Sequence, residues 1–245
     1  MDDNAVSEAI GFILIFSIVV IGIAIVVLYG FPLLLAGQGG ADIRNMEQTM
    51  IVLQNDLKSI SYKMVPYKET ALQVSGGVLF VTEESGTFTV ERFDGTELYR
   101  TIPGKIRYVA DIDRTHITIE NGAVLTRPGI APGSALLAEP RWYYDDPERV
   151  LILSFIEVRT ESPRSLAGVG RIEMKSISTV TTEYTIPDGL VFIRYIPDPD
   201  DDYSVAWGNY MKGRLSLTPE SEGTYFHSNV ETVVIKKIVI GISGI

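Results

Sequence analysis

The feature that most constrains this chain is an uncharged, apolar segment near its N-terminus. Residues 9–41 include no charged side chain, and most positions are Ile, Val, Leu, Phe, Gly or Ala. A helix needs about 20 apolar residues to cross a bilayer, so residues 10–29 alone are long enough. A soluble core helix rarely stays apolar on every face for this length. We therefore expect a single N-terminal helix that enters a membrane.

The flanks of this segment differ from those of an ordinary secretory signal peptide, which has a positive n-region and a short apolar core. The first eight residues carry three acids and no Lys or Arg. The nearest basic residue, Arg44, follows the span. Charge asymmetry therefore does not indicate an N-terminus in the cytoplasm.

Two breaks are predicted in the helical pattern. Proline removes one helical hydrogen bond, so Gly30 and Pro32 predict a kink or melted turn near residues 28–32. Gly37, Gly39 and Gly40 predict a second flexible point.

After the glycines, apolar residues recur at alternating spacings of three and four. This pattern is typical of a helix with one apolar stripe that ends before Pro66. The stripe fits a helix that lies on its own domain as well as one that contacts neighbouring subunits. Its members are Ile43, Met46, Met50, Leu53, Leu57, Ile60 and Met64.

Beyond residue 68 the sequence predicts short β-strands separated by turns, with Asn121-Gly122 as a strong hairpin signal. Residues 230–242 read as a strand covered on both faces, or as one with a bulge near two lysines. Residues 203–215 fit a short helix. We expect an α+β fold in which a long N-terminal hydrophobic helix (residues 5–66) precedes an antiparallel β-sandwich or barrel-like extracellular domain (residues 67–245).

Composition narrows the function. There are 31 acidic against 21 basic residues, a net charge of −10, which disfavours binding to nucleic-acid backbones. The chain has no cysteine, which excludes disulfides and thiolate chemistry. Of its two histidines, His116 alternates with Ile117 and Ile119 and is predicted to face solvent. These features predict no cofactor and no enzymatic activity.

The acidic run near residue 200 is the most tempting chemical site. Asp198, Asp200 and Asp202 resemble the first half of a calcium-binding loop, but Tyr203 stands where such a loop needs glycine. A solvated acidic turn is the simpler interpretation, and no metal site is expected. The aromatic run at residues 142–144 fits either a binding patch or, more simply, buried packing at a strand edge.

The opening residues resemble the N-termini of archaeal type IV pilin-like and archaellin-like proteins, in which a short charged leader precedes a Val-Ser-x-x-Ile-Gly element. That element is Val6, Ser7, Ile10 and Gly11 here. The resemblance implies a leader at residues 1–4 that a prepilin peptidase cuts between Asn4 and Ala5. The leader reads Asp-Asp-Asn where the family usually has Lys or Arg before the cut. More loosely, residues 106–108 and 117–124 are similar to membrane-anchored pilin-like archaeal proteins of unassigned function.

By this resemblance the chain would be a structural subunit of an extracellular filament. The apolar helix would exchange membrane lipid for neighbouring copies of itself, and the β domain would form the outer surface. The implied assembly partners are a cytoplasmic ATPase and a membrane platform. A monomeric, membrane-anchored ectodomain that binds extracellular ligands is the main alternative, and an anchored hydrolase is a third.

Overall fold

The computed structural model describes residues 3–129 and 131–244. The chain divides into two compact units, Met1–Asp42 and Ile43–Ile245. The division lies directly after the three glycines predicted as a flexible point, and well before residue 67, where the sequence predicted the β domain to begin.

The first unit is helical. Helix α1 (Asp3–Ile25) leads into a π-helical turn (Val26–Gly30) and then into α2 (Phe31–Lys63). In that turn the Phe31 amide donates to the carbonyl of Val26, five residues earlier. Pro32 has no amide hydrogen and its ring crowds the preceding turn, so a widened turn is an understandable response. The irregularity predicted here is therefore present, but as a π-helical turn rather than a melted one.

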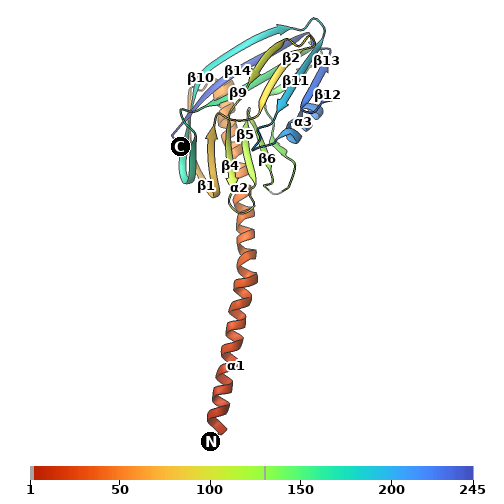
Figure 1. Ribbon diagram of the computed structural model, residues 1–245. Helices are drawn as coiled ribbons and strands as arrows, with labels where there is room; N and C mark the ends of the chain where they lie inside the picture. Colours follow the sequence, from red (N-terminus) through yellow and green to blue (C-terminus); the bar gives the residue numbers. More distant parts are fainter. Residues whose placement is uncertain (1–2, 130, 245) are drawn as a thin grey trace. The chain divides into compact units, whose positions relative to one another are not determined.

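The second unit holds residues 43–63 of α2, two β-sheets and one short helix (Figure 1). Fold class and β-rich character are confirmed, and every neighbouring pair of strands is antiparallel except β9–β14, which is parallel. The nine-stranded sheet has the order β7 (Ala135–Ala138), β6 (Ala123–Arg127), β5 (His116–Glu120), β4 (Lys105–Ala110), β1 (Tyr67–Thr82), β10 (Arg164–Thr185), β14 (Thr232–Ser243), β9 (Val150–Arg159) and β8 (Trp142–Asp145). The five-stranded sheet has the order β12 (Thr218–Ser221), β13 (Thr224–Ser228), β11 (Leu190–Ile196), β2 (Thr87–Arg92) and β3 (Glu97–Thr101), and α3 spans Ser204–Gly213.

Each face of the larger sheet carries one core, although much of β10 is exposed. One face shares an aromatic-rich core with the five-stranded sheet and α3, and the other shares an aliphatic core with α2. Strand β14 takes part in both cores: Val233 and Ile235 point into the first, and Ile238 into the second. The predicted strand is therefore present, but each half buries only one face and leaves the opposite positions half-buried. The ladder irregularity lies in the partner strand, between Ser176 and Ser178, and not at the lysines.

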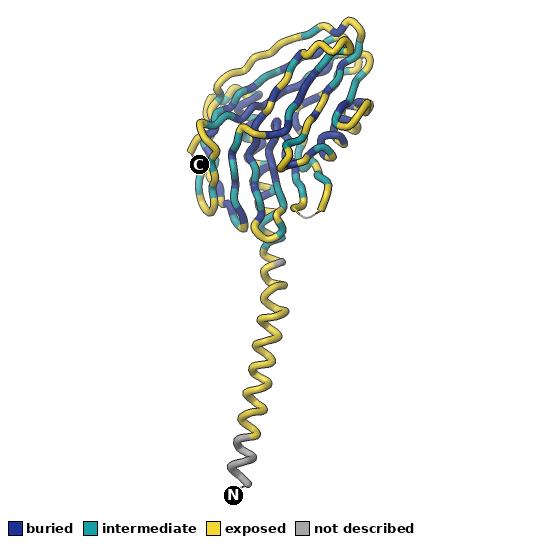
Figure 2. The backbone as a smooth tube through the Cα atoms, in the orientation of Figure 1, coloured by how far each residue is buried: buried dark blue, intermediate teal, exposed yellow. Residues whose placement is uncertain are grey.

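The apolar stripe of α2 packs on its own domain. Five of its seven members are at most 3% exposed, and Ile43 packs against them (Figure 2). Met64 does not belong to the stripe: its backbone is left-handed (φ 56°), it lies after the end of α2 at Lys63, and it is 91% exposed. Of the two interpretations of the stripe, the structure therefore supports the one in which the helix lies on its own sheet. The five buried members are Met46, Met50, Leu53, Leu57 and Ile60.

The predicted hairpin is also present. Asn121 (φ 50°) and Gly122 (φ 71°) link β5 to β6 in the left-handed conformations that this turn type requires. Helix α2 holds the turn in place, because Gln54 Nε2 donates to the carbonyl oxygens of Gly122 (2.7 Å) and Glu139 (3.0 Å). The short helix predicted between residues 203 and 215 is α3.

Candidate functional site

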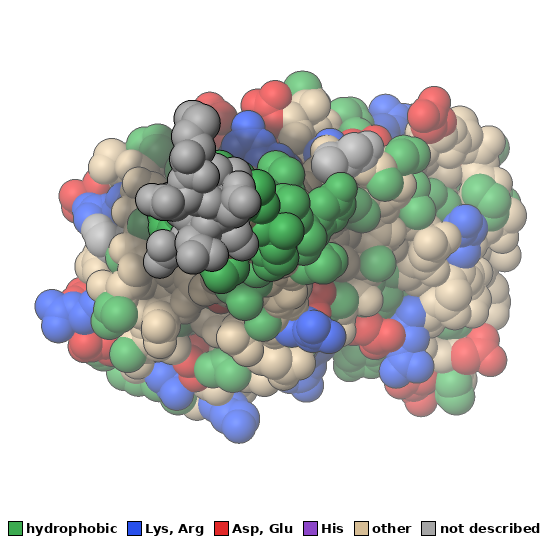
Figure 3. Space-filling model, turned by 90° about the horizontal axis from the view of Figure 1, so that it is seen from below, with side chains coloured by type: hydrophobic (Ala, Val, Ile, Leu, Met, Phe, Trp, Pro, Cys, Tyr) green, Lys and Arg blue, Asp and Glu red, His purple; other side chains and the backbone are tan. Residues whose placement is uncertain are grey.

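The apolar helix of the first unit exposes a long run of large apolar side chains. Every large apolar side chain described between Ile10 and Leu35 is 40–74% exposed. Figure 3 looks from the N-terminal end of this helix, and beside the atoms drawn in grey the side chains in view there are hydrophobic. Among the described residues it is the one helix long and apolar enough to cross a membrane, with a mean hydropathy of 3.2 in its most apolar window. Such an area is far larger than a water-exposed surface ordinarily carries, so it calls for lipid or protein to cover it.

The residues that carry the pilin-like resemblance lie at the start of this helix. Asn4, Ala5, Val6 and Ser7 fall within the backbone of α1, and their side chains are outside the described part of the structure. Ile10 is 58% exposed, and Gly11 is a helical residue with open space around it. The predicted cut between Asn4 and Ala5 remains a prediction.

The residues predicted to form a hinge all lie in helical backbone. Gly30 closes the π-helical turn, and Pro32 is the second residue of α2. Gly37, Gly39 and Gly40 lie inside α2, in regular helix. Hinge motion at these positions stays a prediction.

The three acids considered for calcium do not converge. Asp198 accepts a hydrogen bond from Lys105 Nζ (2.8 Å), and Asp202 accepts one from the amide of Ser204 (2.8 Å). The Asp200 side chain is exposed. The run is therefore organised as part of an ion-pair network and a turn before α3. Its central residue is Asp201, which the sequence did not single out.

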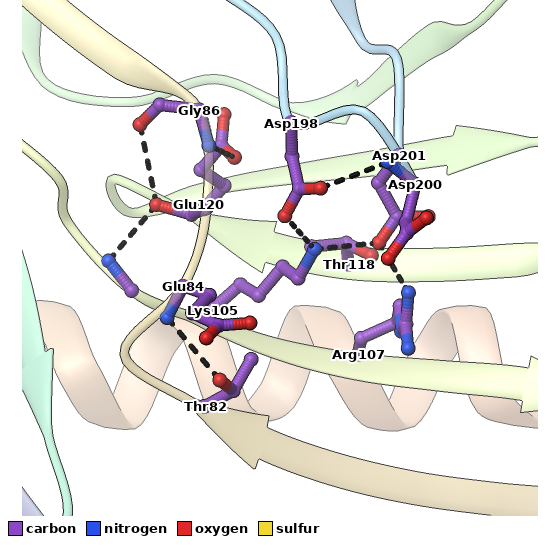
Figure 4. Close-up of polar contacts among 12 residues, drawn as sticks. Thr82, Glu84, Gly86, Lys105, Arg107, Thr118, Glu120, Asp198, Asp200 and Asp201 are labelled. Carbon is purple, nitrogen blue, oxygen red and sulfur yellow. Dashed lines mark hydrogen bonds and ion pairs between the residues drawn. The ribbon is translucent and has the colours of Figure 1, made fainter.

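Asp201 has a fully buried carboxylate surrounded by cations (Figure 4). Its Oδ2 accepts hydrogen bonds from Lys105 Nζ (2.7 Å) and Arg107 Nη1 (2.6 Å). Its Oδ1 lies 2.6 Å from His116 Nδ1 and 3.8 Å from Arg127 Nη1. The prediction that His116 faces solvent is wrong, because the loop after β11 covers that face of β5 and the histidine side chain is only 16% exposed.

The electrostatics of Asp201 follow from these contacts. Burial alone would raise the pKa of this carboxyl, but the hydrogen bonds from His116 and Lys105, and the charges of Lys105 and Arg107, outweigh burial and hold the pKa well below its usual range. Asp201 is therefore ionised at neutral pH, and it joins the loop before α3 to strands β4 and β5.

A second buried carboxylate, Glu120, lies at the end of β5. Its two oxygens accept hydrogen bonds from Trp207 Nε1 (2.9 Å) and from the amide of Gly86 (3.1 Å). A Cβ at position 86 would lie 2.4 Å from the ring of Tyr195, so this close approach requires glycine. Burial raises the pKa of Glu120, and its hydrogen bonds only partly offset that effect. The residue connects α3, β5 and the start of β2 inside the core.

The sequence carried one signal of the polar contacts around Asp201 and Glu120: polar residues occur at alternate positions of β4 and β5. Lys105 and Arg107 in β4, and His116, Thr118 and Glu120 in β5, alternate with apolar residues. Such a pattern ordinarily indicates a solvent face. Here that face is covered by a loop and by α3, whose positions depend on the tertiary fold.

The aromatic run at residues 142–144 divides between core and surface. Trp142 is buried and donates from Nε1 to the carbonyl of Ser154 (2.8 Å). Tyr143 is exposed, and Tyr144 contacts His227 with the two rings tilted and their centroids 4.0 Å apart. The packing interpretation therefore holds for Trp142.

The contacts of the buried carboxylates predict that the domain loses stability in acid. A carboxylate with a lowered native pKa contributes stability above its unfolded-state pKa of about 4, and that contribution is lost as the pH falls toward the native pKa. Asp201, Asp198 and Glu157 all have lowered pKa values, because bonds to Lys, Arg, His, Tyr or Thr side chains overcome the effect of burial. The pKa of Glu120 is raised instead, so its contribution to stability increases on acidification and partly compensates for the loss at the other three. We expect the unfolding temperature to drop as the pH falls from about 5 to about 2. Fluorescence of Trp142 and Trp207, both buried in the β domain, would report this change.

If the unfolding temperature were flat over that range, the assignment of Asp201 as a buried ionised group would be contradicted. The Asp201→Asn variant is the internal control, because its loss of stability on acidification should be smaller than that of the parent chain.

Comparison with known proteins identifies a family but no characterised relative. The search of curated proteins finds no match, and neither does the search of solved structures. A family model described as a family of unknown function (DUF7289) matches residues 4–236, which covers the apolar helix and nearly all of the β domain. The chain therefore belongs to the DUF7289 family.

Proposed function

We propose that this chain is a structural subunit of an extracellular, type IV pilus-like filament. The apolar helix would form the filament core, and the β domain would face outward. Before assembly the same helix would anchor the chain in the cell membrane, and a prepilin peptidase, an ATPase and a membrane platform would serve its assembly. The N-terminal resemblance to archaeal pilin-like proteins supports this role.

The observation that carries the proposal is the continuous exposure of apolar side chains around the helix from Ile10 to Leu35. A single bilayer crossing needs about 20 residues. The uncharged stretch continues through residue 41, beyond that need. Lipid and a bundle of like helices both cover such a surface, and in both environments the helical backbone satisfies its own hydrogen bonds.

The proposed role is not catalytic. The two most buried carboxylates, Asp201 and Glu120, are bonded to protein donors. Glu120 is only 1% exposed. Both fit a structural role in holding loops and helices to the sheet.

A monomeric, membrane-anchored ectodomain is the second candidate, and one observation favours it. The apolar stripe of α2 is buried on its own sheet, which leaves residues 10–35 as the main apolar surface for other molecules. A single bilayer crossing would cover most of that surface.

Purification from the native cell envelope would separate the two candidates. For a filament subunit we expect the chain in the sheared extracellular fraction, as filaments visible by electron microscopy. Its intact mass should be that of a chain that begins at Ala5. Recovery only from the membrane, as a monomer that still carries Met1, would overturn the filament proposal in favour of the anchored ectodomain.

A charge placed in the helix tests its role directly. Arginine at the centre of a membrane helix costs about 2.5–3.5 kcal/mol, so the Ile18→Arg variant should lose filaments and enter membranes less well. Ile18→Leu is the matched control and should behave as the parent chain. Unchanged filament yield in Ile18→Arg, measured by sedimentation after shearing, would place this part of the helix outside an apolar core.

A further inference from the structure

A pocket with a volume of about 780 Å³ lies along the last turns of α2, beside residues 139–141. All of the residues that line it belong to the second unit, so its geometry does not depend on the apolar helix of the first unit. We call it the basic pocket and define it by the three cationic side chains that line it, Lys58, Lys63 and Arg141.

The cationic side chains that line the basic pocket outnumber the carboxylates that line it by three to one. The one acid that lines it, Glu139, has its carboxylate 3.3 Å from Arg214 Nε. Lys58 Nζ donates to the backbone carbonyl of Glu139 (3.0 Å) and not to its carboxylate. Within the described residues, Lys58, Lys63 and Arg141 have no carboxylate at ion-pair distance.

The ring of Tyr62, which lines the pocket, lies close to two cations, of which Arg141 lines the pocket and Lys236 does not. The Arg141 guanidinium lies 4.5 Å from the ring centroid of Tyr62, and Lys236 Nζ lies 5.1 Å from the same centroid. The ring attracts both cations, but the cations repel each other. The pKa of Lys58 is lowered, chiefly by burial; the charge of Glu139 opposes this shift, and the charge of Arg141 adds to it by less than Glu139 opposes it.

This arrangement contrasts with the other cation cluster of the same domain. Lys105 and Arg107 also lie close together, but Asp198 and Asp201 neutralise them inside the protein. In the basic pocket the described residues place no carboxylate in direct contact with the three cations, although the chain has ten more acidic than basic residues. An anion from solution would relieve the repulsion and receive charge-assisted hydrogen bonds.

We propose that the basic pocket binds the oxyanion group of a small ligand, a carboxylate, phosphate or sulfate. The Arg141 guanidinium offers paired donors that suit such a group, and Lys58 and Lys63 offer point charges beside it. The proposal is independent of filament formation, because all of the donors belong to one β domain.

Isothermal titration calorimetry on the full chain in detergent would test it. The probes are inorganic phosphate, inorganic sulfate and glucuronate, each titrated against a chloride solution of equal ionic strength. We expect saturable one-to-one binding of at least one probe. Each change removes a charge-assisted hydrogen bond to the ligand, so Arg141→Gln and Lys58→Gln should each weaken binding about tenfold or more.

The matched control is Lys175→Gln, which removes an exposed cation on β10, away from the basic pocket, and should bind as the parent chain does. Unfolding temperatures of the variants would establish that each remains folded. Equal binding of phosphate and sulfate would identify a general oxyanion site, and preferential binding of glucuronate would identify a sugar acid as the ligand class.

Two results would overturn the proposal. One is the absence of saturable heat for all three probes with folded protein. The other is equal affinity in the parent chain and in Arg141→Gln. If the Lys58→Gln and Arg141→Gln changes instead reduced self-association while no probe bound, an acidic surface of a second copy would be the occupant, and the small-ligand assignment would fail.

Discussion

The Asp201→Asn variant is expected to unfold with a free energy about 3–5 kcal/mol lower than that of the parent chain, because removing one partner from a buried ion pair leaves uncompensated charge. Lys105, which is 3% exposed, would keep only Asp198 as an ion-pair partner, and Arg107 and His116 would lose their shared carboxylate. The measurement is urea unfolding of the detergent-solubilised chain at pH 7, followed by tryptophan fluorescence.

Asp200→Asn is the matched control for this variant. It makes the same chemical change one residue away, on a side chain that is exposed, and should alter the free energy of unfolding by no more than about 0.5 kcal/mol. Equal effects of the two substitutions would mean that the cluster around Asp201 contributes no more than an ordinary surface turn.

The second large effect is expected in the contact between α2 and the sheet. Leu53 is completely buried in the aliphatic core. Leu53→Ala should lower the free energy of unfolding by about 2–5 kcal/mol, through lost burial and the cavity that remains. The same denaturation experiment measures it.

Val52→Ala, one residue earlier in the same helix, is the control because Val52 is 54% exposed. Its effect should stay within about 0.5 kcal/mol. A small effect of Leu53→Ala on the isolated chain, together with a loss of filaments, would instead place the stripe between subunits.

The local elements of this protein could be predicted from sequence because their signals are local. The uncharged run predicts the apolar helix, the three-and-four spacing predicts the continuation of α2, and Asn121-Gly122 predicts its hairpin. Periodicity alone could not say what the stripe covers. The stripe covers the aliphatic face of the large sheet, and this face is assembled from strands far apart in sequence.

The polar clusters could not be predicted for a related reason. Asp201 stands among other acids that look alike in sequence, and only its position opposite Lys105 and His116 distinguishes it. Strand order decides which charges meet. The parallel pairing of β9 with β14 was equally hidden, because the residues between the two strands form β10 to β13 and α3 and give no local pairing signal.

The place of β14 in the large sheet also determines when the domain can become complete. This strand follows all the other described strands in sequence, yet it lies between β10 and β9 and contributes side chains to both cores. Until it is synthesised, the β8–β9 hairpin has no strand that joins it to the rest of the sheet. Long-range pairing of this kind slows folding. A chain that crosses a membrane during synthesis would thus have its apolar helix available for insertion well before its β domain could close.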